Sequence, residues 1–249
     1  ALNYMDKEGV DQAFIIQNSV IGDCNEYISE AVARYPKRFF ASVQVDPFSK
    51  DAASTLEHYA SLSRPNVFKM EISEQYGWSG MHRDLRVFDS PGMSDLWDIA
   101  LKYKMAVMFD TGLIGTNGYQ TEQFAKLADA YPSLPIIIEH GCMCKNDFDT
   151  DSELRPQWDA MAELGRKENI YMGLTAIVET AGNMERAMWV LEHLLNIAGE
   201  RKIVWGSDIP GNMRFWTYNN MIEWAEKAPC LTERQKDLFL AQNMLDMFK

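Results

Sequence analysis

Residues 135–142 read PIIIEHGC, and this stretch contains the pattern that decides the fold. An apolar run is followed at once by two ionisable residues, Glu139 and His140, and then by a glycine. The run is nearly all apolar rather than alternating, which is typical of a parallel strand covered on both faces. The stretch therefore predicts a buried strand whose carboxyl end presents polar side chains.

Six other short apolar runs repeat this pattern, with helix-like segments between them. The predicted strands are 13–17, 39–45, 67–72, 106–111, 135–140, 169–174 and 202–208. The predicted helices are 26–35, 51–61, 94–103, 121–131, 156–167, 184–198 and 232–248. Several of these helices start at a Ser or Thr cap or stop at a proline. Strands that alternate with helices in this way predict an α/β fold.

The architecture that we favour is a TIM (β/α)8-type barrel, formed by a single domain over residues 1–249. A doubly wound sheet usually has a glycine-rich turn after its first strand, and the residues after 13–17 contain no such motif. No Gly/Ser-rich linker or shift in composition divides the chain. Because only seven strands are visible and the chain opens in a helix-like segment, we infer that the first strand is missing from this chain.

Composition and charge narrow the classes of function. Hydrophobic residues make up 47% of the 249 residues, and the net charge of −12 argues against nucleic-acid binding. No apolar run approaches the ~20 residues that span a bilayer, and the N-terminus lacks the pattern of a signal peptide. The chain is therefore not expected to bind membranes. The four cysteines include no CxxC pair, which predicts reduced thiols and a cytoplasmic protein.

Ionisable residues gather where the predicted strands end, which in such a barrel is where the active site lies. Asp110, His140 and Asp208 each close a strand, and Lys69 and Glu71 lie on one face of another strand. Carboxylates and an imidazole at one mouth suit a divalent metal such as Zn²⁺ or Mn²⁺, which lowers the pKa of bound water. An imidazole that binds no metal can act as a general acid or base.

Each of these residues also has a purely structural interpretation. Asp208 could cap the helix that follows it, Asp110 could be a turn residue, and His140 could be a structural strand-end histidine. Lys69 and Glu71 could satisfy each other inside the barrel. The long segment 75–92 after the third predicted strand could cover the site or form a surface excursion. If it covers the site, it adds four residues, Tyr76, Trp78, His82 and Arg83, to Lys69 and Glu71 as candidate substrate-binding residues.

Five segments resemble the amidohydrolase-related superfamily, in particular amidohydrolase family 2 and its aminocarboxymuconate-semialdehyde decarboxylase-like group. The segments are MDKEGVDQAFIIQN (5–18), NEYISEAVARYPKRFFASVQVDP (25–47), YPSLPIIIEHGC (131–142), RKIVWGSDIP (201–210) and LTERQKDLFLAQNMLDMFK (231–249). They follow the family's order and spacing over nearly the whole chain, so the resemblance implies the family's barrel and its site.

The resemblance implies a role for each strand-end residue. His140 matches the family's sixth-strand histidine, an acid/base residue or metal neighbour, and Asp208 matches the eighth-strand aspartate, which binds metal and can activate water. The family's fifth strand ends in a histidine where this chain has Asp110, and the first-strand His-x-His or Glu-x-His pair has no counterpart. The implied metal ligands are Asp110, His140 and Asp208. Alternatively, Lys69 pairs with Asp110 or Glu71 in place of the metal.

The leading functional hypothesis is a hydrolase that acts on a small carbonyl compound, a lactone or amide that carries a carboxylate. Asp208 would activate water, a metal or Lys69 would polarise the carbonyl group, and His140 would assist proton transfer. The second hypothesis is a metal-dependent decarboxylase of a small aromatic or muconate-like acid, in which His140 or Asp208 protonates carbon. The third is a non-catalytic, truncated barrel that binds a ligand or a partner. We also expect a homodimer.

Overall fold

The structure is a computed structural model that describes residues 1–62, 67–78, 88, 92–143 and 148–248. The side chain of Met143 is also left undescribed. Of the four loop residues proposed to bind substrate, His82 and Arg83 lie outside the described residues.

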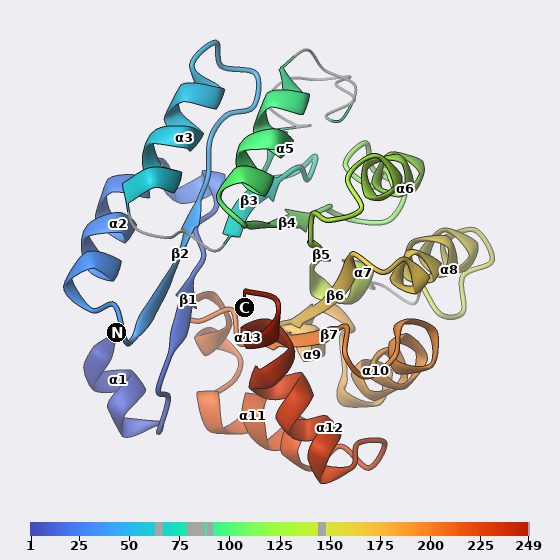
Figure 1. The fold of residues 1–249 in the computed structure, drawn as a ribbon. Coiled ribbons are helices and arrows are strands. Elements are labelled where there is room, and N and C mark those ends of the chain that lie inside the picture. Colours follow the sequence, from blue (N-terminus) through green and yellow to red (C-terminus); the bar gives the residue numbers. More distant parts are fainter. Residues whose placement is uncertain (63–66, 79–87, 89–91, 144–147, 249) are drawn as a thin grey trace.

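Seven parallel strands form one curled sheet, in which each strand pairs with the next one along the chain (Figure 1). Within the described residues, β1 and β7 are the two edges of this sheet, so the predicted barrel is present without an eighth strand. The strands are β1 (Ala13–Ile15), β2 (Phe39–Val43), β3 (Val67–Glu71), β4 (Ala106–Asp110), β5 (Ile136–Ile138), β6 (Ile170–Thr175) and β7 (Ile203–Gly206).

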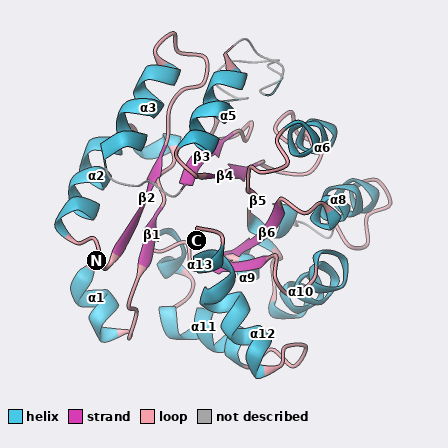
Figure 2. Cartoon of the chain, viewed as in Figure 1, coloured by secondary structure: helices cyan, strands magenta, loops and turns pink. Residues whose placement is uncertain are grey.

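Helices lie around the outer side of the curled sheet (Figure 2). The longer helices are α2 (Asn25–Arg34), α3 (Ala52–Leu62), α5 (Met93–Lys102), α6 (Thr121–Ala130), α8 (Leu154–Glu163), α10 (Met184–Ala198) and α11 (Tyr218–Glu226). The shorter ones are α1 (Leu2–Lys7), α7 (His140–Met143), α9 (Ile177–Thr180), α12 (Glu233–Asp237) and α13 (Asn243–Asp246), with single turns η1 (Ser19–Ile21), η3 (Leu164–Arg166), η4 (Gly211–Arg214) and η5 (Leu238–Gln242).

Buried side chains pack into three cores, of which one joins Met5 of α1, Ile28 of α2 and Phe39 of β2. The large outer core lies between the sheet and the helices and includes Phe68 and Phe109, both fully buried. The smaller inner core joins Val67, Met108 and Ile137 inside the curl, where Phe248 from the C-terminal end packs against it. Side chains two residues apart lie on the same face of a strand. The inner face therefore continues from these apolar residues to polar residues at the carboxyl ends of the strands.

The order and type of the seven predicted strands are confirmed, but their ends and some helices differ from the prediction. The strands predicted at 13–17 and 202–208 are shorter, because Ile16 and Gln17 lie beyond β1, and Ser207 and Asp208 lie beyond β7. Helix α11 was not predicted, since its sequence begins with the weak helix formers Tyr, Asn and Asn. The long helix predicted over 232–248 contains a π-helical stretch, η5, after which Asn243 donates hydrogen bonds to the carbonyl oxygens of Glu200 and Ile203.

None of the helices in the described part of the chain is both long enough and apolar enough to cross a membrane.

Candidate active site

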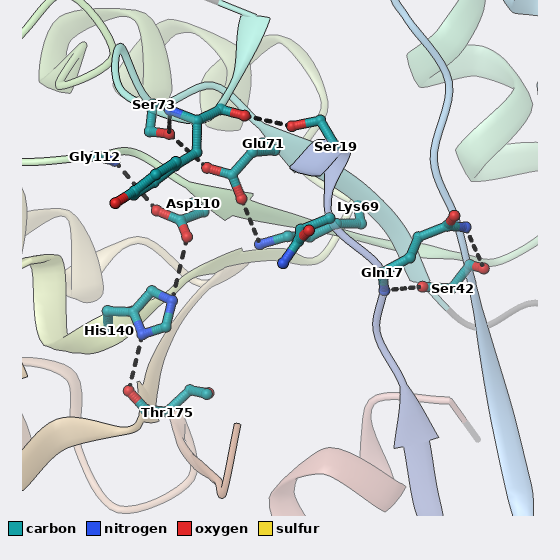
Figure 3. A network of polar contacts seen from close by, with 12 residues as sticks. Gln17, Ser19, Ser42, Lys69, Glu71, Ser73, Asp110, Gly112, His140 and Thr175 are labelled. Atoms are coloured by element: carbon teal, nitrogen blue, oxygen red, sulfur yellow. Dashed lines mark hydrogen bonds and ion pairs between the residues drawn. The ribbon is translucent and has the colours of Figure 1, made fainter. Parts of the chain in front are cut away.

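The carboxyl ends of four strands bring the predicted residues to one end of the barrel, and Figure 3 shows four of them, Lys69, Glu71, Asp110 and His140. Lys69 and Glu71 belong to β3, and Asp110 is the last residue of β4. His140 follows β5, and Asp208 follows β7. Lys69 and Glu71 are each only 4% exposed, whereas Asp208 is exposed at the mouth. Parallel strands thus place all five ionisable groups at one edge, as the sequence predicts.

His140 and Asp110 form a half-buried ion pair that fixes the imidazole ring at both nitrogens. The His140 Nε2 atom lies 3.3 Å from the Asp110 carboxylate, and Nδ1 lies 3.0 Å from the carbonyl oxygen of Thr175. Burial disfavours a charged imidazole, but the attraction and hydrogen bond of Asp110, with the charge of Glu139, raise the pKa of His140 to about 9. His140 is therefore charged at neutral pH, and both of its N–H groups donate hydrogen bonds.

The Asp110 carboxylate is held as an anion from the opposite side. Its other oxygen accepts a hydrogen bond of 3.2 Å from the backbone N–H of Gly112. Burial would raise the pKa of Asp110, but the charges of His140 and Lys69 outweigh it and hold the pKa well below its usual range. The ion partner of Asp110 is therefore His140 and not Lys69, the partner that the sequence offered as an alternative.

Lys69 and Glu71 form a second pair, which is buried, beside the first. The Lys69 Nζ atom lies 3.9 Å from one oxygen of Glu71, and the hydroxyl of Ser73 donates to the other at 2.7 Å. Burial opposes the charge of Lys69, but Glu71, Asp110 and more distant carboxylates raise its pKa. Burial and repulsion from Asp110 raise the pKa of Glu71 to about 7, although Lys69 and Ser73 favour its anion. The site thus contains a buried ammonium group beside a carboxyl group that titrates near neutral pH.

Asp208 differs from the other carboxylates because nothing in the described part of the chain holds it. The structure gives its side chain no hydrogen bond or ion pair there, and Pro210, not Asp208, is the N-cap of the turn η4. The capping interpretation is therefore wrong. Partial loss of hydration raises the pKa of Asp208, while the charges of His140 and Lys69 act in the opposite direction. The result is an exposed carboxylate beside two cations, with its oxygens available to water.

The backbone at these strand ends is strained. His140 and Cys142 have φ angles of 58° and 60°, with Gly141 at 58° between them, so three successive residues are left-handed. Asp208 has a φ of 53°. For residues with a Cβ atom this conformation costs roughly 1–2 kcal/mol each, and such strain persists where surrounding contacts enforce it, often at functional sites. The strain coincides with the two residues to which the sequence assigned catalysis.

Glu139 is a residue of this site to which the sequence reasoning assigned no role. It is 3% exposed, and its Oε2 atom is buried without a hydrogen-bond partner among the described residues. Ile137 belongs to the inner core, so Glu139, two residues later, continues the same face. This alternation along the strand could have predicted from the sequence that Glu139 faces the inside of the barrel. The Glu139 carboxylate acts electrostatically on both Lys69 and His140.

Gly173 on β6 provides the space that the Glu139 carboxylate fills. A Cβ atom at position 173 would lie 2.5 Å from Oε2 of Glu139. We expect Gly173→Ala to lower the free energy of unfolding by about 1–3 kcal/mol through overpacking, measured by urea unfolding. In a Glu139→Ala background the same substitution should cost much less. An equal cost in both backgrounds would show that the carboxylate does not occupy this space.

The loop residues proposed to bind substrate are only partly placed at the site. Tyr76 is exposed, and its backbone carbonyl accepts a hydrogen bond of 2.5 Å from the hydroxyl of Ser19. Trp78 is 8% exposed and lines a cavity of about 300 Å³ together with Gln17 and Asp46. The cavity lies at the carboxyl ends of β1 and β2, and none of the five ionisable residues at the strand ends lines it.

The predicted metal ligands do not fit a metal ion as they are arranged. Nδ1 of His140 is bonded to the Thr175 carbonyl, Nε2 faces the Asp110 carboxylate, and the other oxygen of Asp110 accepts from Gly112, so a metal ion would have to displace this ion pair. Across residues 1–62, 67–78, 88, 92–143 and 148–248, no three His, Cys, Asp or Glu side chains are grouped as a metal site requires. The cations within this group of side chains are Lys69 and the imidazolium.

Comparison with known proteins agrees with the barrel fold. The model of the amidohydrolase family matches residues 1–249. A probable 2-pyrone-4,6-dicarboxylic acid hydrolase from Acinetobacter baumannii, solved with citric acid, has a TM-score of 0.77 and 14% identity over 99% of this chain and 86% of that one. Comparison with curated protein sequences found no match.

Two other solved structures are similar in fold at equally low identity. The 5-carboxyvanillate decarboxylase LigW from Sphingomonas paucimobilis has a TM-score of 0.67 and 16% identity over 99% of this chain and 81% of that one. An amidohydrolase from Burkholderia multivorans with bound zinc has a TM-score of 0.74 and 12% identity over 99% and 86%. The chain belongs to the amidohydrolase family, whose structural neighbours include both hydrolases and decarboxylases.

Proposed function

We propose that this chain is a hydrolase that opens a small lactone or cleaves a small amide, with a carboxylate elsewhere on the substrate. The observation that carries this proposal is the state of Asp208, an exposed carboxylate with a raised pKa that has no partner in the described residues. Such a group can accept a proton from water, which is the first requirement for hydrolysis.

The proposed reaction uses Asp208 as the base and Lys69 as the electrostatic partner. Asp208 accepts a proton from a water molecule while the water oxygen bonds to the substrate carbonyl carbon. The negative charge that develops on the carbonyl oxygen is stabilised by the ammonium group of Lys69, buried where electrostatic interactions are strong. When the carbonyl carbon–leaving group bond breaks, the leaving oxygen or nitrogen takes the proton from Asp208. The charged His140 supplies a second fixed cation, which favours a carboxylated substrate.

Decarboxylation is the less supported alternative for this site. It needs an acid that delivers a proton to carbon, and the Nε2–H group of His140 is already donated to Asp110. A pKa of about 9 also makes the His140 imidazolium a weak acid at neutral pH. The decarboxylases among the structural neighbours keep this reaction as a possible outcome of the test.

The proposal is tested by turnover in ¹⁸O-labelled water with a panel of carboxylated lactones, the matching amides and aromatic carboxylic acids. We expect one ¹⁸O atom in the product carboxylate and no release of CO₂, and we expect activity to persist after the protein is stripped of metal and checked by elemental analysis. Release of CO₂ without ¹⁸O uptake would identify a decarboxylase. Activity that is lost on stripping and restored by Zn²⁺ or Mn²⁺ would show that Lys69 does not replace a metal.

A further inference from the structure

The strained turn that carries His140 is held by side chains from two distant segments. The indole N–H of Trp158, on α8, donates a hydrogen bond of 2.9 Å to the carbonyl oxygen of Gly141. The hydroxyl of Tyr119, in the segment between β4 and α6, donates one of 3.1 Å to the carbonyl oxygen of Cys142. Two consecutive carbonyl groups of the left-handed turn are therefore fixed from outside the turn.

The turn needs such support because its own conformation is unfavourable. Residues with a Cβ atom rarely adopt left-handed angles, and here His140 and Cys142 both do so. Within the turn, the backbone N–H of Cys142 bonds to the carbonyl oxygen of Glu139 at 3.2 Å, which is a long hydrogen bond. A relaxed turn would rotate the Gly141 and Cys142 carbonyl groups away from Trp158 and Tyr119, so these two donors select the strained form.

The direction of the His140 ring depends on this turn. A change of φ at His140 would move its Cβ atom, and the ring could no longer reach both Asp110 at 3.3 Å and Thr175 at 3.0 Å. The contacts of the His140 ring therefore depend on the same turn conformation that Trp158 and Tyr119 contact.

Trp158 is suited to hold the turn because it cannot move independently. It is fully buried, and its ring packs 5.0 Å from Phe148 and 5.2 Å from Trp189, measured between ring centroids. Its indole N–H thus reaches the Gly141 carbonyl from a rigid aromatic cluster. Tyr119 is only partly buried, so its hydrogen bond competes with water.

We propose that Trp158, assisted by Tyr119, is a positioning residue that holds the left-handed turn at residues 140–142 and thereby aims the His140 imidazole at Asp110 and Thr175. Neither residue was a candidate on sequence grounds. The inference rests on the proposed role of His140 for its effect on activity, but its structural part does not depend on any reaction.

The test compares Trp158→Phe with Trp189→Phe. The first removes the indole N–H that reaches the turn and keeps most of the ring. The second removes an equal group from the same cluster, and the structure gives Trp189 no hydrogen bond to the turn. The first readout is the NMR signal of the His140 ring N–H protons, assigned with His140→Gln. We expect Trp158→Phe to shift these signals or remove them by exchange with water, and Trp189→Phe to leave them as in the unmodified protein.

The second readout is the split between kcat and KM on a substrate found by the ¹⁸O panel. We expect Trp158→Phe to lower kcat by roughly 10- to 100-fold with KM nearly unchanged, because small displacements of catalytic groups are costly. Tyr119→Phe, which removes one hydroxyl from a partly buried residue, should give a smaller effect in the same direction and serves if Trp158→Phe fails to fold.

The outcomes separate this inference from the proposed function. Unchanged His140 signals in both Trp158→Phe and Tyr119→Phe would overturn it, whatever the activity. Equal shifts in Trp158→Phe and Trp189→Phe would also overturn it, because the cluster packing and not the hydrogen bond would then be responsible. Shifted signals in a protein that turns over no substrate would support the positioning role while the proposed function fails.

Discussion

Replacement of Asp110 by asparagine is expected to lower the free energy of unfolding by about 3 kcal/mol near pH 6, the largest stability effect that we expect at this site. The pKa of His140 is about 9 against an ordinary value of 6.5, and each unit is worth about 1.4 kcal/mol in favour of the charged, paired imidazole. Asparagine keeps the shape but removes the charge, and it leaves a half-buried imidazolium without its ion partner, which is costly.

The effect depends on pH in a defined direction. The pKa of His140 is raised in the folded state, so its contribution is fully present below pH 6.5 and is lost as the pH rises through 9. The raised pKa of Glu71 adds a slope of the same sign, from its ordinary value of 4.5 up to about 7. Stability of the unmodified protein should therefore fall between about pH 4.5 and 9, and Asp110→Asn should flatten most of this fall.

The measurement is urea unfolding of both proteins at pH 6 and pH 9.5, with the His140 pKa followed by NMR. Asp129→Asn is the matched control, because Asp129 pairs with Lys167 at the surface and such pairs contribute about 1 kcal/mol or less. A difference between unmodified protein and Asp110→Asn that is the same at both pH values would show that Asp110 does not act through the charge of His140.

The barrel was predictable because its signal is repeated and local. Each strand is a short apolar run that ends in a polar residue, as in β4, or is followed by one, as in β5, and parallel strands buried on both faces require such runs. Helix α11 and the π-helical stretch η5 were not predictable in the same way. They depend on tertiary contacts, such as the hydrogen bonds from Asn243 to Glu200 and Ile203, which no local pattern encodes.

Most residues of the site could be predicted from the sequence, but the ion pairs between them could not. Strand ends place Lys69, Asp110, His140 and Asp208 at one mouth whatever the side chains do. Which cation pairs with which carboxylate depends on distances of a few ångströms, and the structure gives Asp110 to His140 and Glu71 to Lys69. The roles of all these residues in catalysis, and the homodimer, stay predictions.

The supporting residues were invisible in the sequence because their contacts cross long separations. Trp158 reaches the turn at Gly141 from 17 residues away, and Gly173 accommodates Glu139 from the neighbouring strand. Tryptophan and glycine are common core residues, so neither position stands out in a chain with 7 Trp and 15 Gly. Only the three-dimensional arrangement places Trp158 at the turn that carries His140 and Gly173 against Glu139.

Asp208→Asn is expected to lower kcat by about 10²- to 10⁴-fold, the range attributed to a general base, while stability changes by no more than about 0.5 kcal/mol. Both expectations come from one property: in the described part of the chain, no hydrogen bond or ion pair engages the Asp208 side chain, and it is exposed. Removing its charge therefore breaks no contact of the described fold, but it removes the group that takes the proton from water. Asp98→Asn, on the outer helix α5, is the matched control and should change neither quantity.

The pH profile and chemical rescue distinguish a base from a residue that only binds substrate. In the unmodified protein, kcat/KM should fall as the pH drops through a pKa above 3.8, the ordinary value of an aspartate, and this acid limb should disappear in Asp208→Asn. Because the position is exposed, added formate should restore part of the activity of Asp208→Ala by supplying a carboxylate from solution. A raised KM with an unchanged kcat would instead make Asp208 a binding residue. The base of the reaction would then have to be sought among the buried carboxyls, where Glu71, with its pKa near 7 beside Lys69, is the best placed.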